Sequence, residues 1–158
     1  MNLPFSEKHL VYRGKSWNTI VSNDQSFLGR CIVYLTTRET DDLMSLTTEE
    51  RTELWEEIMP RLVRSMQASF APDRINYAHL ANAVHHVHWH VVPRYERDPL
   101  RIFEGCTFRD ERVGRNYLNV PERTLGEPLM QKITERLRER FDLEGTPVRL
   151  GVRGVVSA

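Results

Sequence analysis

Four of the six histidines of this 158-residue chain fall within six consecutive residues, inside the segment Val84–Pro93. The segment alternates histidine with apolar residues, which predicts a β-strand because successive side chains of a strand point to opposite faces. His86, His88 and His90 then share one face, with neighbouring side chains about 6.6 to 6.8 Å apart. This pattern constrains the chain to a sheet with one covered face and one face that presents imidazoles to a cleft.

The opposite face of the same strand carries Val87, Trp89 and Val91, residues that a strand buries against a helix. We therefore expect Trp89 to be a core residue that packs under a helix. His85 falls on this apolar face or at the beginning of the strand, and we interpret it as structural. A shift of the register by one residue would exchange the two faces, and His88 would then lie against the helix.

Two further strands precede the histidine segment. The runs Trp17–Val21 and Gly29–Leu35 are rich in β-branched and aromatic residues, and the turn-forming sequence Ser22–Ser26 separates them. This arrangement predicts an antiparallel pair. A short strand at Ile75–Tyr77 and a loop over Ala78–Ala83 are predicted just before the histidines.

A long helix is predicted between these strands. Thr47 followed three residues later by Glu50 forms a capping-box pattern, so the helix should begin there. Apolar residues then recur every four positions as far as Phe70, which gives one apolar face for packing on a sheet. Pro60 should kink this helix, because it lacks a backbone donor and crowds the preceding turn.

The histidine strand is expected to end at Pro93, and Arg94–Glu127 has no clean period, so we predict an irregular segment. A second amphipathic helix is predicted from Pro128 to Phe141. The tail Val148–Val156 is expected to be a final strand or a packed arm. Together these elements predict one α+β domain over 1–158, an antiparallel sheet of about five strands with a long helix and a C-terminal helix.

Composition limits the classes of partner. Lys plus Arg equals Asp plus Glu at 22 each, so no global basic field attracts nucleic acid or an anionic membrane, and an anionic ligand must be captured locally. The chain shows neither a signal peptide nor an apolar run long enough to span a membrane, and we expect a cytoplasmic protein. Cys31 and Cys106 show no metal-binding spacing and are expected to be reduced thiols.

The histidine row has three interpretations. It could be a set of polar residues on an exposed strand. It could be a metal site, because three histidines hold zinc in some catalytic sites, although no further ligand is evident from the pattern. It could also supply a nucleophile, because a neutral imidazole can attack phosphorus while an adjacent imidazole donates to a phosphoryl oxygen.

The segment His86-Val-His-Trp-His-Val-Val92, followed by Pro93-Arg94, resembles the signature of the histidine triad (HIT) superfamily of nucleotide hydrolases and transferases. The stretch Ile75–Asn82 resembles the strand and phosphate loop of a bacterial branch described as diadenosine tetraphosphate hydrolase-like. Gln25–Gly29 and the helix over 47–70 resemble its strands and long helix. The resemblance covers roughly residues 12–98, and the role of the C-terminal extension 99–158 stays open.

The resemblance implies a role for each histidine of the row. His88 would attack the α-phosphorus and form a covalent nucleotidyl-histidine that water then hydrolyses. His90 would hold a phosphate oxygen, and His86 would orient the other two through hydrogen bonding. Asn82 would donate from the loop to the α-phosphate.

Three further residues are candidates for nucleotide binding. Asn76 is either a functional residue or a local backbone partner. Asn23 lies near the expected position of the ribose hydroxyls, and its alternative is an ordinary turn residue. Arg94 could meet distal phosphates with two donors or could form a salt bridge on the surface.

The chain departs from the branch at two positions. The branch usually has glycine before Asn82, whereas this chain has Ala81, which restricts the backbone of the phosphate loop. A histidine common after the second strand is replaced by Arg38, which would move a structural contact or add positive charge.

These observations predict a homodimeric hydrolase or nucleotidyl transferase that cleaves at the α-phosphate of a dinucleoside polyphosphate or a nucleoside phosphoramidate. No cofactor is expected to be obligatory, and Mg²⁺ can accompany a polyphosphate substrate. Two alternatives remain open, a nucleotide-binding regulatory module with little turnover and a three-histidine metal site.

Overall fold

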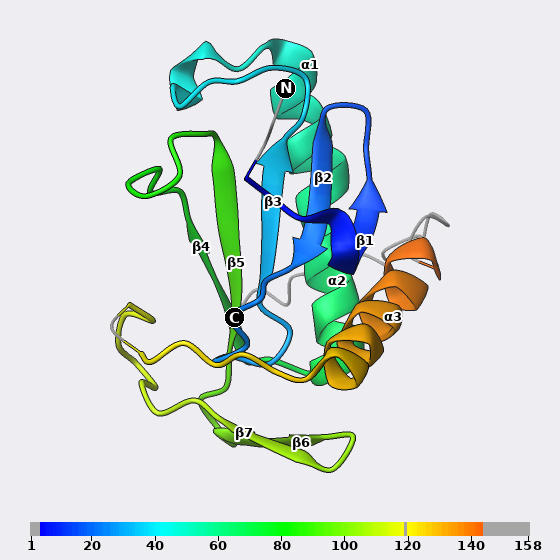
Figure 1. Ribbon diagram of the computed structural model, residues 1–158, viewed down its shortest axis with the longest axis vertical. Coiled ribbons are helices and arrows are strands. Elements are labelled where there is room, and N and C mark those ends of the chain that lie inside the picture. The colour runs from blue at the N-terminus through cyan, green and yellow to red at the C-terminus, as the bar shows by residue number, and fades with distance from the viewer. Residues whose placement is uncertain (1–3, 119, 144–158) are drawn as a thin grey trace, which may run out of the picture.

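A five-stranded antiparallel sheet organises the chain, and the computed structural model describes residues 4–118 and 120–143. The spatial order of the strands is β1-β2-β3-β5-β4 (Figure 1). Their bounds are Leu10–Arg13 for β1, Trp17–Val21 for β2, Cys31–Leu35 for β3, Arg74–Ala78 for β4 and His88–Arg94 for β5. The predicted α+β class and the antiparallel pairing are confirmed, whereas the predicted tail Val148–Val156 lies outside the described residues.

The long helix begins as predicted. The Thr47 side chain accepts from the backbone of Glu50, whose carboxylate accepts from the Thr47 N–H, so the capping box is complete. The helix has three parts, which are α1 over Thr48–Thr52, a π-helical segment over Glu53–Ile58 and α2 over Met59–Phe70.

Pro60 is accommodated by a widened turn in the preceding helix. The Met59 N–H bonds to the Leu54 carbonyl, five residues earlier, and Pro60 follows in the first turn of α2. The predicted disturbance is therefore a π-helical segment before the proline, because the wider turn gives the ring room that a regular α-helical turn denies it.

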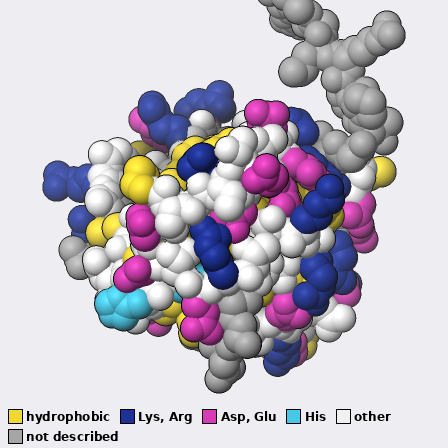
Figure 2. Space-filling model, turned by 90° about the horizontal axis from the view of Figure 1, so that it is seen from above, with side chains coloured by type: hydrophobic (Ala, Val, Ile, Leu, Met, Phe, Trp, Pro, Cys, Tyr) yellow, Lys and Arg dark blue, Asp and Glu magenta, His cyan; other side chains and the backbone are white. Residues whose placement is uncertain are grey.

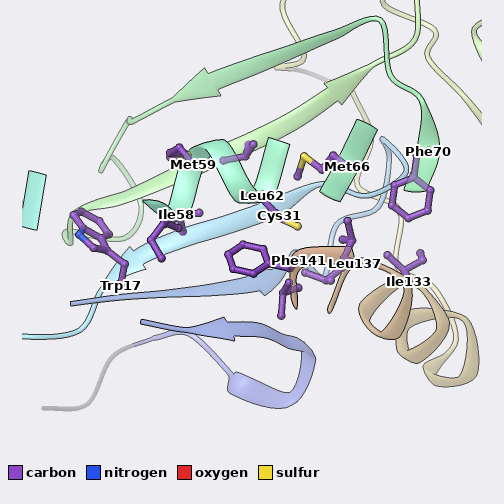
Figure 3. Packing of buried hydrophobic residues seen from close by; sticks show 14 of the residues in the cluster. Trp17, Cys31, Ile58, Met59, Leu62, Met66, Phe70, Ile133, Leu137 and Phe141 are labelled. Atoms are coloured by element: carbon purple, nitrogen blue, oxygen red, sulfur yellow. The ribbon is translucent and has the colours of Figure 1, made fainter. Parts of the chain in front are cut away.

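One face of the sheet packs on α2 and on α3, which spans Glu127–Leu143 and confirms the second predicted helix. Figure 3 shows side chains of α2 and α3, among them Leu62 and Leu137, converging on the strands. Both are fully buried, and the Ser65 hydroxyl of α2 donates to the Leu137 carbonyl at 2.7 Å. Trp89 is partly buried on this side, edge-to-face with Trp55 at 5.2 Å between ring centroids, as expected of a residue that faces the helix.

The histidine strand is shorter at its start than predicted. Strand β5 begins at His88, and the preceding residues leave the sheet. The Val87 N–H donates to the Thr40 carbonyl at 2.7 Å, and the Val87 carbonyl accepts from the Leu35 N–H at 3.1 Å. The bond to Leu35 continues the register between β3 and β5 for one residue, whereas the bond to Thr40 takes the chain away from the sheet, so the strand predicted from Val84 begins four residues later. Val87 is nevertheless fully buried in the main core with Val91, on the face predicted for it.

The end of β5 also differs from the prediction. The strand runs through Pro93, which lies opposite Ile75 of β4, and ends at Arg94. Strand β3 pairs with β5 only as far as Val91, so β5 has one strand neighbour beyond that residue and tolerates a proline.

The segment predicted to be irregular contains a β-hairpin. Strands β6 (Leu100–Phe103) and β7 (Cys106–Arg109) pair antiparallel across Glu104 and Gly105, whose φ angles are 49° and 75°. Two positive φ values are typical of the tight turns that join hairpin strands. Glutamate is uncommon at the first of these positions, and the sequence therefore gave little indication of the turn.

Charges of both signs are intermingled on the surface that Figure 2 shows, in keeping with the balanced composition. Within residues 4–118 and 120–143, no helix has the length and apolar character needed to cross a membrane.

Candidate active site

The open face of the sheet, opposite the helices, carries two of the predicted histidines. His88 and His90 of β5 lie across from Tyr34 and Ile32 of β3 in the strand register. The two imidazoles have centroids 5.0 Å apart and planes inclined at 82°. The structure therefore brings His88 and His90 together on one face, where alternation along a strand places them.

His88 is held in one tautomer. Its Nδ1 lies 2.7 Å from the backbone carbonyl oxygen of His86. A carbonyl can only accept, so Nδ1 carries the proton and Nε2 keeps a lone pair. The side chain is buried, and burial lowers the pKa of His88, so the imidazole is neutral around neutral pH.

His86 contributes in a different way from the one expected. It lies before β5, is buried, and its Nε2 donates to the Leu35 carbonyl at 2.7 Å. The group of His86 that orients His88 is its backbone carbonyl. The His86 ring still lies on the side of His88, since the Phe5 ring is 6.1 Å from His86 and 5.3 Å from His88. What differs from the prediction is that His86 precedes the assigned strand and that its side chain bonds to Leu35.

His90 lies beside a cation that the sequence analysis did not identify. Nη2 of Arg30 is 3.5 Å from Nδ1 of His90, and Arg30 in turn forms an ion pair with Asp24. Burial and the nearby Arg30 charge lower the pKa of His90 to about 4. His90 is accordingly uncharged at neutral pH.

The three asparagines predicted to bind the nucleotide lie on different elements and differ in exposure. Asn82 is exposed in the loop between β4 and β5, directly after Ala81, whose φ of 51° is in the left-handed region. Asn23 is exposed in the turn between β2 and β3. Asn76 lies on β4, where its Oδ1 accepts from Nη1 of Arg94 at 2.8 Å, so it has the role of a local partner that was one of its two interpretations.

Arg94 is neither a free phosphate ligand nor a surface residue. It is 6% exposed, and all five N–H donors of its guanidinium are engaged within the protein. Two contact the Asp110 carboxylate, one contacts Asn76, and two contact the carbonyls of Arg112 and Arg115. The phosphate contact considered for Arg94 is therefore replaced by a structural role, in which it holds the 110–115 segment to the end of β5.

Two other sequence interpretations are resolved by their surroundings. Arg38 bonds to the Glu50 carboxylate at 2.5 Å and to the Ser45 carbonyl at 2.8 Å, so it forms a structural contact at the start of the long helix. His85 is exposed and precedes β5, so it lies neither on the apolar face nor at the beginning of the strand, the two placements predicted for it.

Aromatic residues from segments before β1 and after β7 flank the two histidines. The Phe5 ring stacks on Tyr34 at 4.5 Å and lies 5.3 Å from the ring of His88. Tyr117 lies 6.5 Å from the ring of His90. Neither residue belongs to a periodic pattern, and only the tertiary fold brings these distant segments to the site.

Metal binding was one of the alternatives for the histidine row. In the part of the chain that the structure describes, no group of three His, Cys, Asp or Glu side chains is placed to hold a metal ion.

Solved structures with the same fold include histidine triad proteins of low sequence identity. A protein from Marinobacter aquaeolei VT8 is 20% identical, with a TM-score of 0.68 and coverage of 85% of this chain and 89% of that chain. A Bradyrhizobium japonicum protein is 16% identical, with a TM-score of 0.66 and coverage of 84% and 89%. A Sinorhizobium meliloti protein is 17% identical, with a TM-score of 0.65 and coverage of 83% and 87%.

The sequence itself identifies the family. No curated protein matches the chain. The HIT domain family, however, matches residues 6–97, which is more than half of the chain and includes both histidines of the open face. This chain therefore belongs to the HIT domain family.

Proposed function

We propose that this protein is a nucleotide hydrolase or nucleotidyl transferase that acts at the α-phosphate of a dinucleoside polyphosphate or a nucleoside phosphoramidate. The observation that carries the proposal is the bond from Nδ1 of His88 to the His86 carbonyl, which leaves Nε2 with a lone pair on a neutral imidazole. A neutral imidazole with a fixed ring is a competent nucleophile.

The reaction proceeds in two displacements. Nε2 of His88 attacks the α-phosphorus, so a P–N bond forms while the bond from phosphorus to the leaving oxygen or nitrogen breaks. Water then attacks the same phosphorus, the P–N bond breaks, and a nucleoside monophosphate leaves. His90 donates to a phosphoryl oxygen in both steps, and Asn82 does so from the loop, because fixed donors stabilise the charge that develops on these oxygens.

The nucleoside is proposed to lie against Phe5. The partly exposed Phe5 ring borders His88, is backed by the buried ring of Tyr34, and offers an apolar planar surface for a base. Asn23, exposed in the turn after β2, is the candidate for the ribose hydroxyls.

The proposal is tested by intact-protein mass spectrometry after mixing with diadenosine tetraphosphate and with adenosine phosphoramidate. The quench uses an alkaline denaturant, because a P–N bond to histidine is labile in acid. We expect the protein to gain the mass of one nucleoside monophosphate residue, and His88→Ala to gain none. His85→Ala is the matched control, since this exposed neighbour should keep the adduct.

A nucleotide-binding module with little turnover is the second candidate function. Such a module would bind nucleotide on the same open face. Its melting temperature would rise with nucleotide concentration, but neither adduct nor product would form. That combination of results would favour the module over the enzyme.

We also propose that the chemistry needs no tightly bound metal, because the nucleophile is an imidazole that requires no metal to lose a proton. Mg²⁺ can still accompany a polyphosphate substrate. Metal analysis of the purified protein should find less than stoichiometric zinc. Stoichiometric zinc, with activity lost when it is removed, would contradict this proposal.

A homodimer working in the cytoplasm is proposed as the assembly. Strand β4 is an edge of the sheet, and the nearby side chains of Trp55 and Tyr77 are 46% and 45% exposed. A free strand edge beside exposed aromatic residues favours pairing with a second copy. Sedimentation at micromolar concentration should give twice the chain mass, and a species of 18.6 kDa alone would contradict the dimer.

A further inference from the structure

Arg30 is a largely buried cation beside the open face. It immediately precedes β3, and its side chain is 13% exposed. One end of the guanidinium pairs with Asp24, and Nη2 reaches Nδ1 of His90 at 3.5 Å. Its carbon Cζ lies 5.3 Å from the centre of the Tyr117 ring. Arg30 is thus held from two sides while one amino group faces His90.

The chemistry of this contact determines where His90 carries its proton. A guanidinium has donors and no acceptor, so Nδ1 of His90 must accept in this contact and cannot carry a hydrogen. A neutral imidazole has one N–H, which then lies on Nε2. The same cation opposes a second positive charge on the ring, and burial acts in the same direction.

His88 and His90 therefore have opposite tautomers. His88 has its proton on Nδ1, because the His86 carbonyl accepts it, and offers a lone pair at Nε2. His90 has its lone pair at Nδ1, because Arg30 donates to it, and offers a proton at Nε2. Two identical residues on one strand face thus supply a nucleophile and a hydrogen-bond donor.

We propose that Arg30 is a positioning residue that fixes the proton of His90 on Nε2 and keeps this imidazole neutral as a donor to the phosphoryl group. The donor role rests on the proposed function, whereas the tautomer of His90 is a property of the free protein. Tyr117, which Arg94 helps to place by holding the 110–115 segment, supports Arg30 from the other side.

Other charged or titratable groups also face His90, and they set the expected direction of change. On β5 and at the end of β4, His88 and His79 oppose its protonation when they are charged. In the turn after β2, the Asp24 carboxylate favours its protonation. The Tyr117 ring lies at 6.5 Å. Removal of Arg30 takes away the cation that opposes protonation of His90, and it leaves the Asp24 carboxylate without its ion-pair partner. Both effects should raise the pKa of His90.

The test compares two substitutions by long-range ¹H–¹⁵N NMR of the imidazoles in the nucleotide-free protein. Arg30→Met removes the donor and the charge, whereas Arg30→Gln keeps a donor and removes the charge. We expect the Nε2–H tautomer in the unmodified protein and in Arg30→Gln, and a mixture of tautomers in Arg30→Met. In both variants the pKa of His90 should rise by about one unit or more, and the acid limb of the kcat/KM profile should move with it.

Arg109→Met is the matched control, because Arg109 is an exposed arginine on β7 and should leave His90 unchanged. A proton on Nδ1 of His90, or a charged His90 at pH 7, would overturn the proposal in the unmodified protein alone. A tautomer and pKa that do not respond to either Arg30 substitution would also overturn it.

Asp24→Asn keeps the proposal testable if the Arg30 variants do not fold. It removes the carboxylate that favours protonation, so the pKa of His90 should fall, and a rise would contradict the proposal. The NMR readout needs no substrate. Absence of an adduct on His88 would therefore refute the proposed function, while an unresponsive His90 would refute the role of Arg30.

Discussion

The two faces of the central sheet differ in what holds them in place. On the helix-covered face, side chains such as Val33 and Val91 are fully buried among apolar side chains of the long helix and α3. On the open face, the histidines are held by polar partners, His88 by the nearby His86 carbonyl and His90 by Arg30, which is 60 residues away. One face therefore supplies most of the stability, and the other face supplies the chemistry.

This difference shows why the open face depends on segments that are far apart in the sequence. The helix-covered face is complete once the strands and helices pack, because apolar burial is non-directional. The open face becomes a site only when Phe5 lies beside His88 and Tyr117 lies beside His90. Tyr117 thus belongs to the candidate site, and Arg94 attaches the neighbouring residues Arg112 and Arg115 to β5.

The largest expected effect comes from comparing single substitutions on the two opposite faces of β5. His88→Ala should lower turnover of diadenosine tetraphosphate and adenosine phosphoramidate by several powers of ten, because the covalent step is lost, while nucleotide affinity changes far less. Trp89→Phe, its neighbour on the other face, should lower the melting temperature with turnover of the folded protein nearly unchanged. Steady-state kinetics and calorimetry measure both variants. Unchanged hydrolysis by His88→Ala would show that the nucleophile is another residue.

Arg94 tests whether the extension is attached as the structure indicates. Arg94→Met leaves Asp110 as a buried unpaired carboxylate, so the free energy of unfolding should fall by about 3 to 5 kcal/mol. Arg94→Met with Asp110→Asn should recover part of this loss. The exposed pair Arg74–Glu96 gives the matched control, and Arg74→Met should cost less than about 1 kcal/mol. Urea denaturation measures all three, and equal losses in the two single variants would contradict a buried anchor.

His90→Ala gives a smaller effect on turnover than His88→Ala. Removal of one fixed donor should lower kcat by about 10²- to 10³-fold and should also weaken phosphate affinity. Nucleophilic attack remains available, so the adduct on His88 should still form, but more slowly. Rapid-quench mass spectrometry separates the two steps. If His90→Ala formed no adduct at all, His90 would be either the nucleophile itself or indispensable for the attack.

Features that depend only on residues close together in the chain could be predicted from the sequence. The capping box at Thr47 and the shared face of His88 and His90 follow from short-range pattern, and both are present. The start of β5 at His88 was not predictable in the same way, because the Val87 N–H donates to Thr40, a residue far along the chain. Alternation alone contains no information about such a competing partner.

The functional partners were missed for a related reason. Arg94 seemed suited to a phosphate because an arginine after the histidine strand has a suitable charge, yet its five donors are satisfied by segments up to 21 residues away. Arg30 lies in no recognisable pattern, and only the β3–β5 pairing brings it to His90. Charge and position along the chain indicate candidates, whereas burial and partners decide their roles.

The smallest expected effect concerns two alanines with nearly the same backbone conformation in different regions. Ala71, at the end of α2, has a φ of 49°, and Ala81, before Asn82 in the phosphate loop, has a φ of 51°. A left-handed conformation costs an L-residue about 1 to 2 kcal/mol, whereas glycine adopts it freely but loses about 0.4 to 1 kcal/mol through greater entropy of the unfolded chain.

Ala71→Gly and Ala81→Gly should therefore each stabilise the protein, by up to about 1 kcal/mol. Their effects on function should differ. Ala71 ends a helix that only supports the sheet, so its substitution should leave kcat/KM unchanged. Ala81→Gly frees the loop that carries Asn82, and kcat/KM should fall a few-fold because the donor is less well held before substrate binds. Chemical denaturation and steady-state kinetics measure the two quantities, and a loss of stability in Ala81→Gly would show that the loop does not need a positive φ at this residue.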